Sequence, residues 1–82
     1  GADGISILNG LSSYDEKEAA ITLKMAENAD EVFLLCDSSK IEKNSFIKFA
    51  PLSKINYLVT DNGLDKKYLK KYKEHNISII TE

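Results

Sequence analysis

The segment Val32–Lys40 (V-F-L-L-C-D-S-S-K) constrains the fold of this chain more than any other part of the sequence. Its first five residues are apolar and rich in β-formers, which predicts a strand buried on both faces. The apolar run stops at Asp37, and the polar residues that follow end with Lys40. Parallel α/β sheets place their ligand sites at the carboxyl ends of their strands. We therefore expect the other elements to be arranged around this strand and a binding site to lie at its end.

Three other apolar runs predict strands, at Ile5–Leu8, Tyr57–Thr60 and Ile77–Thr81. Helical patterns separate these runs, which predicts an α/β fold: a small parallel sheet of about four strands with crossover helices. Four strands and two helices are few for a free-standing α/β domain. We therefore expect residues 1–82 to be a single domain or a fragment of a longer protein.

The first helix should run from about Tyr14 to Ala29, with Ser13 and Glu16 forming a capping box at its start. At about 100° per residue, Glu18 falls on the largely apolar face of this helix. The other residues on that face are Ile21, Thr22, Met25 and Ala29. A carboxylate in such a place needs a partner or a purpose.

The second helix should span Lys66–His75, with Asp65 as its cap and Asn76 stopping it in the left-handed conformation. Pro51 should begin a single helical turn. The segment Ile41–Ala50 is compatible with either an extended chain or a turn of helix.

Composition excludes several classes of function. The chain has 82 residues, a net charge of −2 and no arginine, so neither nucleic acid nor an acidic membrane surface is indicated as a direct partner. Cys36 is the single cysteine and lies in the predicted strand, which favours a reduced, cytoplasmic setting. No apolar run approaches the roughly 18 residues of a membrane helix, so we expect no membrane association. No metal-ligand spacing or phosphate-binding loop is present, so we expect no metal and no cofactor.

Charge is unevenly distributed along the chain. Residues 1–42 contain three lysines and nine acidic residues, a net charge of −6, whereas residues 43–82 contain eight lysines and four acidic residues, a net charge of +4. A solvated helix face explains much of this difference, although it could also orient a neighbouring molecule.

Polar residues gather at three strand ends. The first cluster is Asp3-Gly4, extended by Asn9-Gly10 and Glu18; the second is Asp37–Lys40; and the third is Thr60–Gly63. Turn formation explains each cluster when it is taken alone. Together, the carboxylates of Asp3 and Glu18 and the ammonium of Lys40 suit a small polyol that carries a phosphate, because carboxylates accept from sugar hydroxyls and the lysine attracts negative charge.

Five segments resemble, in order and in spacing, the C-terminal effector-sensing domain of DeoR-type bacterial transcriptional regulators. They are G-A-D-G-I, G-L-S-S-Y-D-E-K-E-A, C-D-S-S-K-I, F-A-P-L-S-K-I and L-V-T-D-N-G-L-D. The resemblance covers essentially the whole chain and corresponds to the second half of the sensor. It implies a Rossmann-like half of a domain similar to ribose-5-phosphate isomerase. It also implies that the family's N-terminal winged helix-turn-helix and the first half of the sensor are absent from this chain.

The resemblance also implies a function. In that family the sensor binds a phosphorylated sugar or a related metabolite, and binding changes the affinity of the DNA-binding domain for its operator. Members are typically oligomeric repressors of sugar-uptake and catabolic operons, often beside phosphotransferase-system genes. The implied partners are therefore a phosphorylated sugar, a second copy in a homo-oligomer, and operator DNA through the N-terminal domain alone.

The family's functional residues can be carried over by position. Asp3 matches the aspartate of the G-A-D motif and is followed by Gly4, Glu18 matches the carboxylate that is the catalytic base in the isomerases, and Lys40 matches the lysine of the D-x-S-K motif. The resemblance implies that Asp3 and Glu18 bind hydroxyls and that Lys40 binds an anionic group. Gly10, Leu11 and Ser12 occupy the place of the isomerases' glycine-rich loop and would shape the pocket. The supporting turn residues are Asp37, Ser39, Thr60 and Asp61.

Two departures bear on catalysis. The loop holds a single glycine, Gly10, and Ala19 stands where the isomerases carry a lysine after the base. Fewer backbone amides are then free to cradle a substrate, so we predict sensing without catalysis. Two alternatives stay open: an isomerase-like enzyme that uses Glu18 as its base, and a small interaction domain whose basic helix, Lys66–Lys73, docks an acidic partner.

Overall fold

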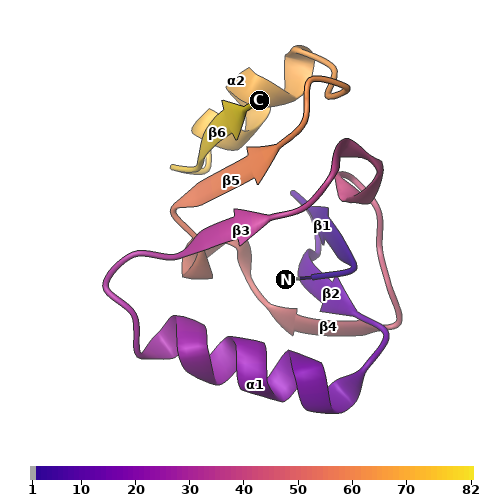
Figure 1. Ribbon diagram of the computed structural model, residues 1–82, viewed down its shortest axis with the longest axis vertical. Coiled ribbons are helices and arrows are strands. Elements are labelled where there is room, and N and C mark those ends of the chain that lie inside the picture. Colours follow the sequence, from indigo (N-terminus) through magenta and orange to yellow (C-terminus); the bar gives the residue numbers. More distant parts are fainter. Residues whose placement is uncertain (1) are drawn as a thin grey trace.

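The computed structural model describes residues 2–82 and contains two three-stranded sheets and two α-helices (Figure 1). The antiparallel sheet has the order β1-β2-β4, with β1 over Gly4–Ser6, β2 over Gly10–Ser13 and β4 over Ile47–Ala50. The parallel sheet has the order β3-β5-β6, with β3 over Phe33–Leu35, β5 over Tyr57–Thr60 and β6 over Ser78–Thr81. The fold class is therefore mixed α/β.

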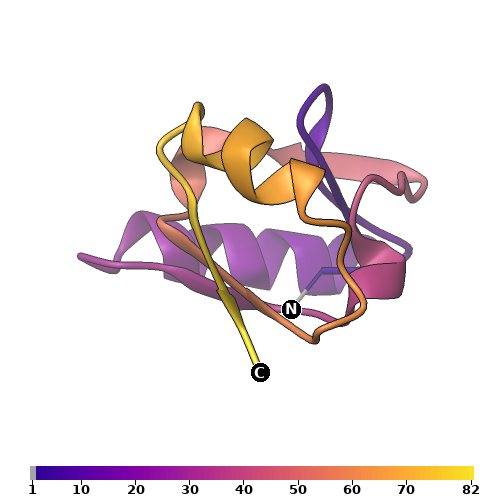
Figure 2. The same ribbon diagram turned by 90° about the horizontal axis from the view of Figure 1, so that it is seen from above.

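The helices pack on different sheets. Helix α1 (Glu16–Glu27) lies along the antiparallel sheet and contacts β4 and β2, whereas α2 (Lys67–Lys73) contacts β6. Single 3₁₀ turns over Ser38–Lys40 and Leu52–Lys54 connect the two sheets. Figure 2 shows α2 above the strands of the parallel sheet.

One apolar core joins the two sheets. Ile5 and Leu11 enter it from the antiparallel sheet, Leu58 enters it from β5, and Tyr72 enters it from α2; each of these side chains is at most 2% exposed. A backbone hydrogen bond from the Glu42 N–H to the Ile5 carbonyl (2.6 Å) adds a polar connection beside this core. The sheets therefore form one structural unit.

The first predicted strand belongs to the antiparallel sheet, so a parallel sheet of about four strands is not observed. Ser6 and Gly10 are paired across a tight turn, and Gly10 has φ +72°, a conformation that glycine adopts without strain. A Cβ at Gly10 would lie 2.3 Å from the Ala50 carbonyl oxygen. The turn reverses the chain at a position where the sequence suggested only a strand end.

The prediction that Val32–Cys36 is buried on both faces is wrong for one face. Leu34 is 5% exposed, whereas Phe33 is 49% and Leu35 is 64% exposed. Phe33 stacks on Tyr57 of β5, with ring centroids 4.4 Å apart, and no element within residues 2–82 covers the pair from outside. The apolar run thus correctly predicted a strand, but the residues present cover only one side of it.

The start of α1 also differs from the prediction. Asp15 is the N-cap, and its carboxylate accepts hydrogen bonds from the backbone N–H groups of Lys17 (2.8 Å) and Glu18 (3.3 Å). The predicted capping box of Ser13 with Glu16 is therefore wrong. Ser13 is buried in β2 and unable to serve as the cap, because the strand extends up to it.

The face of α1 that packs inward is shifted from the predicted one. Ala19 is buried and Leu23 packs against the core, whereas Ile21 is 61% and Met25 is 69% exposed. The predicted stripe that contained Glu18 therefore faces largely outward within residues 2–82.

Several local predictions are confirmed. The strand at Tyr57–Thr60 has the predicted bounds, and a helical turn follows Pro51. Asn76 adopts the left-handed conformation, with φ 63°. Helix α2 is shorter than predicted and its N-cap is Lys66, although the carboxylate of Asp65 accepts from the Lys67 N–H (3.0 Å). The segment Ile41–Ala50, which the sequence left between an extended chain and a helical turn, forms a β-bridge at Ile41 and then strand β4.

Helices α1 and α2 span 12 and 7 residues. Within residues 2–82, no helix has both the length and the apolar character needed to cross a membrane.

Candidate functional site

Asp3 is held at the junction of β1, β2 and α1. Its carboxylate accepts hydrogen bonds from the backbone N–H of Tyr14 (2.9 Å) and from the Ser13 hydroxyl (3.1 Å). The Tyr14 N–H, the Ser13 hydroxyl and the positive charge of Lys40 lower the pKa of Asp3, although partial burial acts in the opposite direction. Asp3 is therefore a fixed carboxylate that is ionised at neutral pH.

Glu18 lies beside Asp3. Both residues line a cavity of about 370 Å³ whose other lining residues are Ala2, Ile21 and Thr22. Glu18 is exposed at the rim, one turn into α1. The structure therefore brings together the two carboxylates that the sequence analysis singled out, because the β1–β2 hairpin returns the chain to the side of Asp3 before α1 begins.

Lys40 lies in the loop that follows strand β3 of the parallel sheet. It ends the 3₁₀ turn that follows β3 and is half-buried, and its backbone N–H bonds the Asp37 carbonyl (3.0 Å). Its positive charge contributes to the lowered pKa of Asp3, after the hydrogen bonds from Tyr14 and Ser13. The residues that line the cavity of Asp3 and Glu18 do not include Lys40.

The second and third polar clusters bond directly to each other. Asp61 accepts from the backbone N–H groups of Ser38 (2.9 Å) and Gly63 (2.7 Å), and these bonds, the Ser38 N–H foremost, lower its pKa. Asp37 caps the 3₁₀ turn and accepts from both the N–H and the hydroxyl of Ser39. These bonds fix the loop that carries Lys40.

Gly4, Gly10, Leu11 and Ser12 occupy buried positions in the antiparallel sheet. A Cβ at Gly4 would lie 2.5 Å from the Lys43 carbonyl oxygen, so this glycine allows two backbone segments to pack closely. The Ser12 hydroxyl accepts from the Ser45 N–H (2.8 Å). These residues support the surface on which Asp3 lies, and they present little area of their own.

Thr60 and Cys36 lie near the carboxyl ends of β5 and β3. Thr60 is 6% exposed, and its hydroxyl has no hydrogen-bond partner among residues 2–82. Burial, with the nearby charges of Asp37 and Asp61, raises the pKa of Cys36 to about 11. The thiol is therefore protonated at neutral pH and is a poor nucleophile.

Sequence reasoning missed Glu42. This residue has a positive φ of 60°, and its carboxylate accepts from the Ile7 N–H (3.0 Å) and from the Tyr72 hydroxyl (2.6 Å). Burial and the bond to Glu42 raise the pKa of Tyr72. A left-handed glutamate has no local signal in the sequence, because its conformation depends on contacts that are 30 and 35 residues away.

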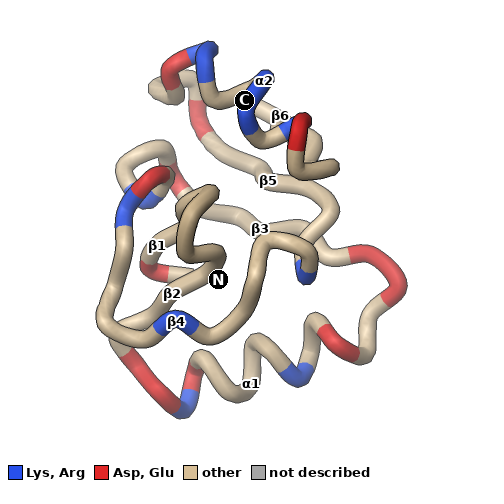
Figure 3. The backbone as a smooth tube through the Cα atoms, turned by 180° about the vertical axis from the view of Figure 1, so that it is seen from behind, with Lys and Arg blue, Asp and Glu red and all other residues tan. Residues whose placement is uncertain are grey.

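The lysines of the second half are concentrated on α2, as Figure 3 shows in blue. Lys67 and Lys71 lie over the ring of Tyr68, with their Nζ atoms 5.2 and 5.8 Å from its centroid. The five lysines between positions 66 and 73 are exposed. Within residues 2–82, no group of three or more histidine, cysteine or acidic residues is arranged to hold a metal ion.

Comparison with known proteins gives a consistent result. The family model described as "DeoR C terminal sensor domain" matches residues 1–62. The HTH-type transcriptional regulator IolR of Bacillus subtilis is 36% identical over 78 residues, which are 95% of this chain and 31% of that protein. The L-fucose operon activator of Haemophilus influenzae is 36% identical over 94% of this chain and 31% of its own length. A lactose phosphotransferase system repressor of Staphylococcus epidermidis is 40% identical over 63 residues, which are 74% of this chain and 25% of that protein. The chain thus spans between a quarter and a third of the length of these relatives, which are transcriptional regulators.

Proposed function

Because this chain belongs to the DeoR C-terminal sensor domain family, we propose that it is the effector-sensing part of a transcriptional regulator of sugar metabolism, and that its effector is a phosphorylated sugar. The observation that carries the proposal is that Asp3 and Glu18 line one cavity. Lys40 ends the polar loop after β3, and its positive charge contributes to the lowered pKa of Asp3. The parallel sheet is then the Rossmann-like part of a larger sugar-isomerase-like sensor, residues 1–82 being its second half.

Each side chain has a separate role in this proposal. The carboxylates of Asp3 and Glu18 accept hydrogen bonds from sugar hydroxyls, and the Lys40 ammonium bonds the phosphate. Asp37, Ser39 and Asp61 fix the loop of Lys40, while Gly10, Leu11 and Ser12 form the sheet beneath Asp3. Thr60 offers a hydroxyl at the neighbouring strand end.

Ligand binding would act by differential affinity. The effector favours one arrangement of the sensor within a homo-oligomer, operator DNA favours another through the N-terminal DNA-binding domain, and the two equilibria are linked. Turnover is not part of the proposal, since Ala19 stands beside Glu18 where a lysine would be needed. The setting is cytoplasmic.

The test uses the full-length regulator and its operator in gel shifts against a panel of sugar phosphates. We expect one phosphorylated sugar to change operator affinity while its unphosphorylated form has little effect. Lys40→Met should weaken the effector by about 10- to 100-fold, because one charged hydrogen bond is lost. Lys43→Met is the matched control, because Lys43 is exposed on the same segment.

A second experiment repeats the gel shifts with Glu18→Gln. Glu16→Gln is its control, because both residues lie in the first turn of α1. The Glu18 variant should lose effector response and keep operator binding. If no sugar phosphate alters operator affinity, and Lys40→Met leaves regulation intact, the proposal is wrong. Aldose–ketose exchange that is abolished by Glu18→Gln would instead identify an enzyme.

A further inference from the structure

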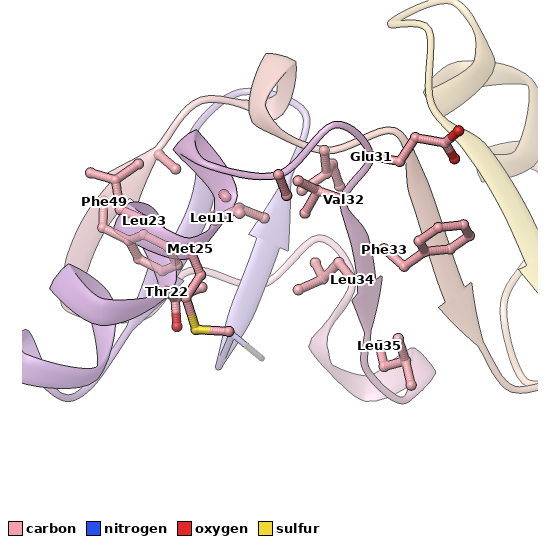
Figure 4. Close-up of a pocket in the computed structure, with 14 residues that line it drawn as sticks. Leu11, Thr22, Leu23, Met25, Glu31, Val32, Phe33, Leu34, Leu35 and Phe49 are labelled. Carbon is pink, nitrogen blue, oxygen red and sulfur yellow. The ribbon is translucent and has the colours of Figure 1, made fainter.

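An apolar groove of about 440 Å³ lies between α1 and β3 (Figure 4). Helix α1 contributes Leu23 and Met25 to it, β3 contributes Leu34, and the antiparallel sheet contributes Leu11 and Phe49. Met25 is 69% exposed, although it lies within the last turn of the helix and lines the groove. The groove is therefore lined by side chains of the kind that normally pack in a core.

The edge of β3 that faces away from β5 is unpaired within residues 2–82. The Val32 carbonyl accepts from the Tyr57 N–H (3.2 Å), and the Cys36 N–H donates to the Val59 carbonyl (3.1 Å). Alternate residues of a parallel strand bond the same neighbour, so the backbone groups of Phe33 and Leu35 point to the other edge. That edge presents donors and acceptors for one more strand.

The described chain begins beside this groove. Ala2 and Thr22 line the smaller cavity near Asp3, and Thr22 also lines the groove, which continues along α1 to Ala29. Chain leading into Ala2 along this groove would pass the carboxyl end of α1 first. It would then run in the same direction as β3, which starts near that end of α1 and leads to Lys40 (Figure 1).

Helix α1 occupies the chain position of a crossover helix, yet it packs on the antiparallel sheet. A helix between two parallel strands normally covers the sheet that those strands form. A strand in the groove would give α1 this partner and would cover Met25. Asp3 would then stand at the carboxyl end of the added strand, next to the ends of β3 and β5.

We propose that an apolar strand of the longer protein, N-terminal to these 82 residues, fills this groove and pairs in parallel with the free edge of β3. The chain spans only 31% of relatives such as IolR, so a protein of that length has residues to supply the strand. About five residues suffice for a strand of ordinary length. The proposal does not depend on which effector the sensor binds.

Hydrogen exchange of individual amides tests the proposal directly. Two polypeptides are compared by NMR: residues 1–82, and the same chain extended by the segment that precedes Gly1 in the parent protein. The Phe33 and Leu35 amides should exchange rapidly in the shorter chain and at least about tenfold more slowly in the longer one. The Cys36 amide, already bonded to Val59, is the internal control. Unchanged rates at Phe33 and Leu35 would overturn the proposal.

Two kinds of variant separate pairing from general stabilisation. Ala26→Asp places a charge in the groove, and Ala20→Asp places the same charge on the exposed side of α1. Only the first should abolish the added protection in the extended chain. If Ala26→Asp prevents folding, prolines at alternate positions of the extension remove its donors without altering residues 1–82. Persistence of the protection with those prolines would contradict the proposal.

Sedimentation of residues 1–82 distinguishes the other possible occupant. A monomer is expected. A dimer in which the Phe33 and Leu35 amides are already protected would assign the groove to a second copy of the chain, and the proposal would be wrong.

Discussion

Glu42 connects two parts of the molecule through one carboxylate, which accepts from the Ile7 N–H and from the Tyr72 hydroxyl. Tyr72 is fully buried, so its hydroxyl cannot turn to water if this acceptor is removed. Leaving a buried donor without a partner costs about 1–3 kcal/mol. The contact therefore stabilises both the β1–β2 turn, through Ile7, and the packing of α2, through Tyr72.

Glu42→Ala should lower the free energy of unfolding by about 1–3 kcal/mol, as measured by urea denaturation. Glu42→Gln should cost less, because an amide oxygen in the place of Glu42 Oε2 can still accept from both donors. Equal stability of the alanine variant and the parent chain would contradict the role assigned to this carboxylate.

The pH dependence of stability should reflect the ionisation of the buried Tyr72 hydroxyl. Burial and the carboxylate of Glu42 raise the pKa of Tyr72 above its ordinary value of 10.0, so the folded protein keeps this proton while the unfolded chain loses it. Stability contributed in this way is complete below pH 10 and decreases as the pH rises further. Urea unfolding between about pH 9 and 11 should show a steeper loss for the parent chain than for Tyr72→Phe. Parallel curves would contradict this expectation.

The pKa of Asp3 can be used to test whether Lys40 lies near its carboxylate. Hydrogen bonds from Tyr14 and Ser13, with the charge of Lys40, hold the pKa of Asp3 below its ordinary value of 3.8. Lys40→Met should raise this pKa towards the ordinary value, and only in part, because the Tyr14 N–H is the largest cause. NMR titration of the side-chain carboxyl measures it, with Lys54→Met as control. Identical values in both variants would place Lys40 away from the site.

At the scale of elements, the start of α1 is a place where a capping motif in the sequence is not the cap that the fold uses. Ser13-x-x-Glu16 fits a capping box, but Ser13 is the last residue of β2. Strand pairing with Ile47 positions Ser13, and the helix therefore begins at the next available cap, Asp15. A local motif could not reveal this, because the competing contact is 34 residues distant.

Asp15→Ala should destabilise the chain by about 0.5–2 kcal/mol, the usual cost of removing an N-cap side chain. Glu16→Ala should cost less than about 0.5 kcal/mol, since Glu16 contributes only through the helix dipole. Thermal or urea unfolding of the two variants makes the comparison. The opposite order would restore the capping box.

The strands show how far periodicity alone can predict the fold. The runs at Val32–Cys36, Tyr57–Thr60 and Ile77–Thr81 gave three parallel strands correctly, because each is a short apolar run bounded by turn residues. The run at Ile5–Leu8 was assigned to the wrong sheet. Its partner is set by the hairpin at Gly10 and by β4, and β4 had no clear pattern of its own.

At the scale of the whole molecule, the two sheets share one core, so we expect one cooperative unfolding transition. Leu58→Ala, at a fully buried position in β5, should cost about 2–5 kcal/mol. Its effect should reach the antiparallel sheet as well, and hydrogen exchange of the Leu11 amide should speed up in step with that of β5. If amide protection decreased in β5 but not at Leu11, the two sheets would be two independent folding units.

For the candidate site, the sequence predicted a group of Asp3, Glu18 and Lys40, because strand ends at one sheet edge collect polar side chains. The structure places Asp3 and Glu18 on one cavity, and the role of the three residues stays a prediction. No pattern in the sequence indicated the Glu42 contacts with Ile7 and Tyr72, because they join residues that are 35 and 30 positions apart.

The uncovered face of β3 has a practical consequence for anyone who purifies these 82 residues alone. Phe33 and Leu35 combine exposed apolar surface with an unpaired strand edge, the two features that drive one chain to add to another. Leu35→Lys should raise the concentration at which light scattering first detects aggregates while leaving the unfolding midpoint nearly unchanged. We therefore expect association between copies, and not unfolding, to limit how long the isolated chain stays in solution.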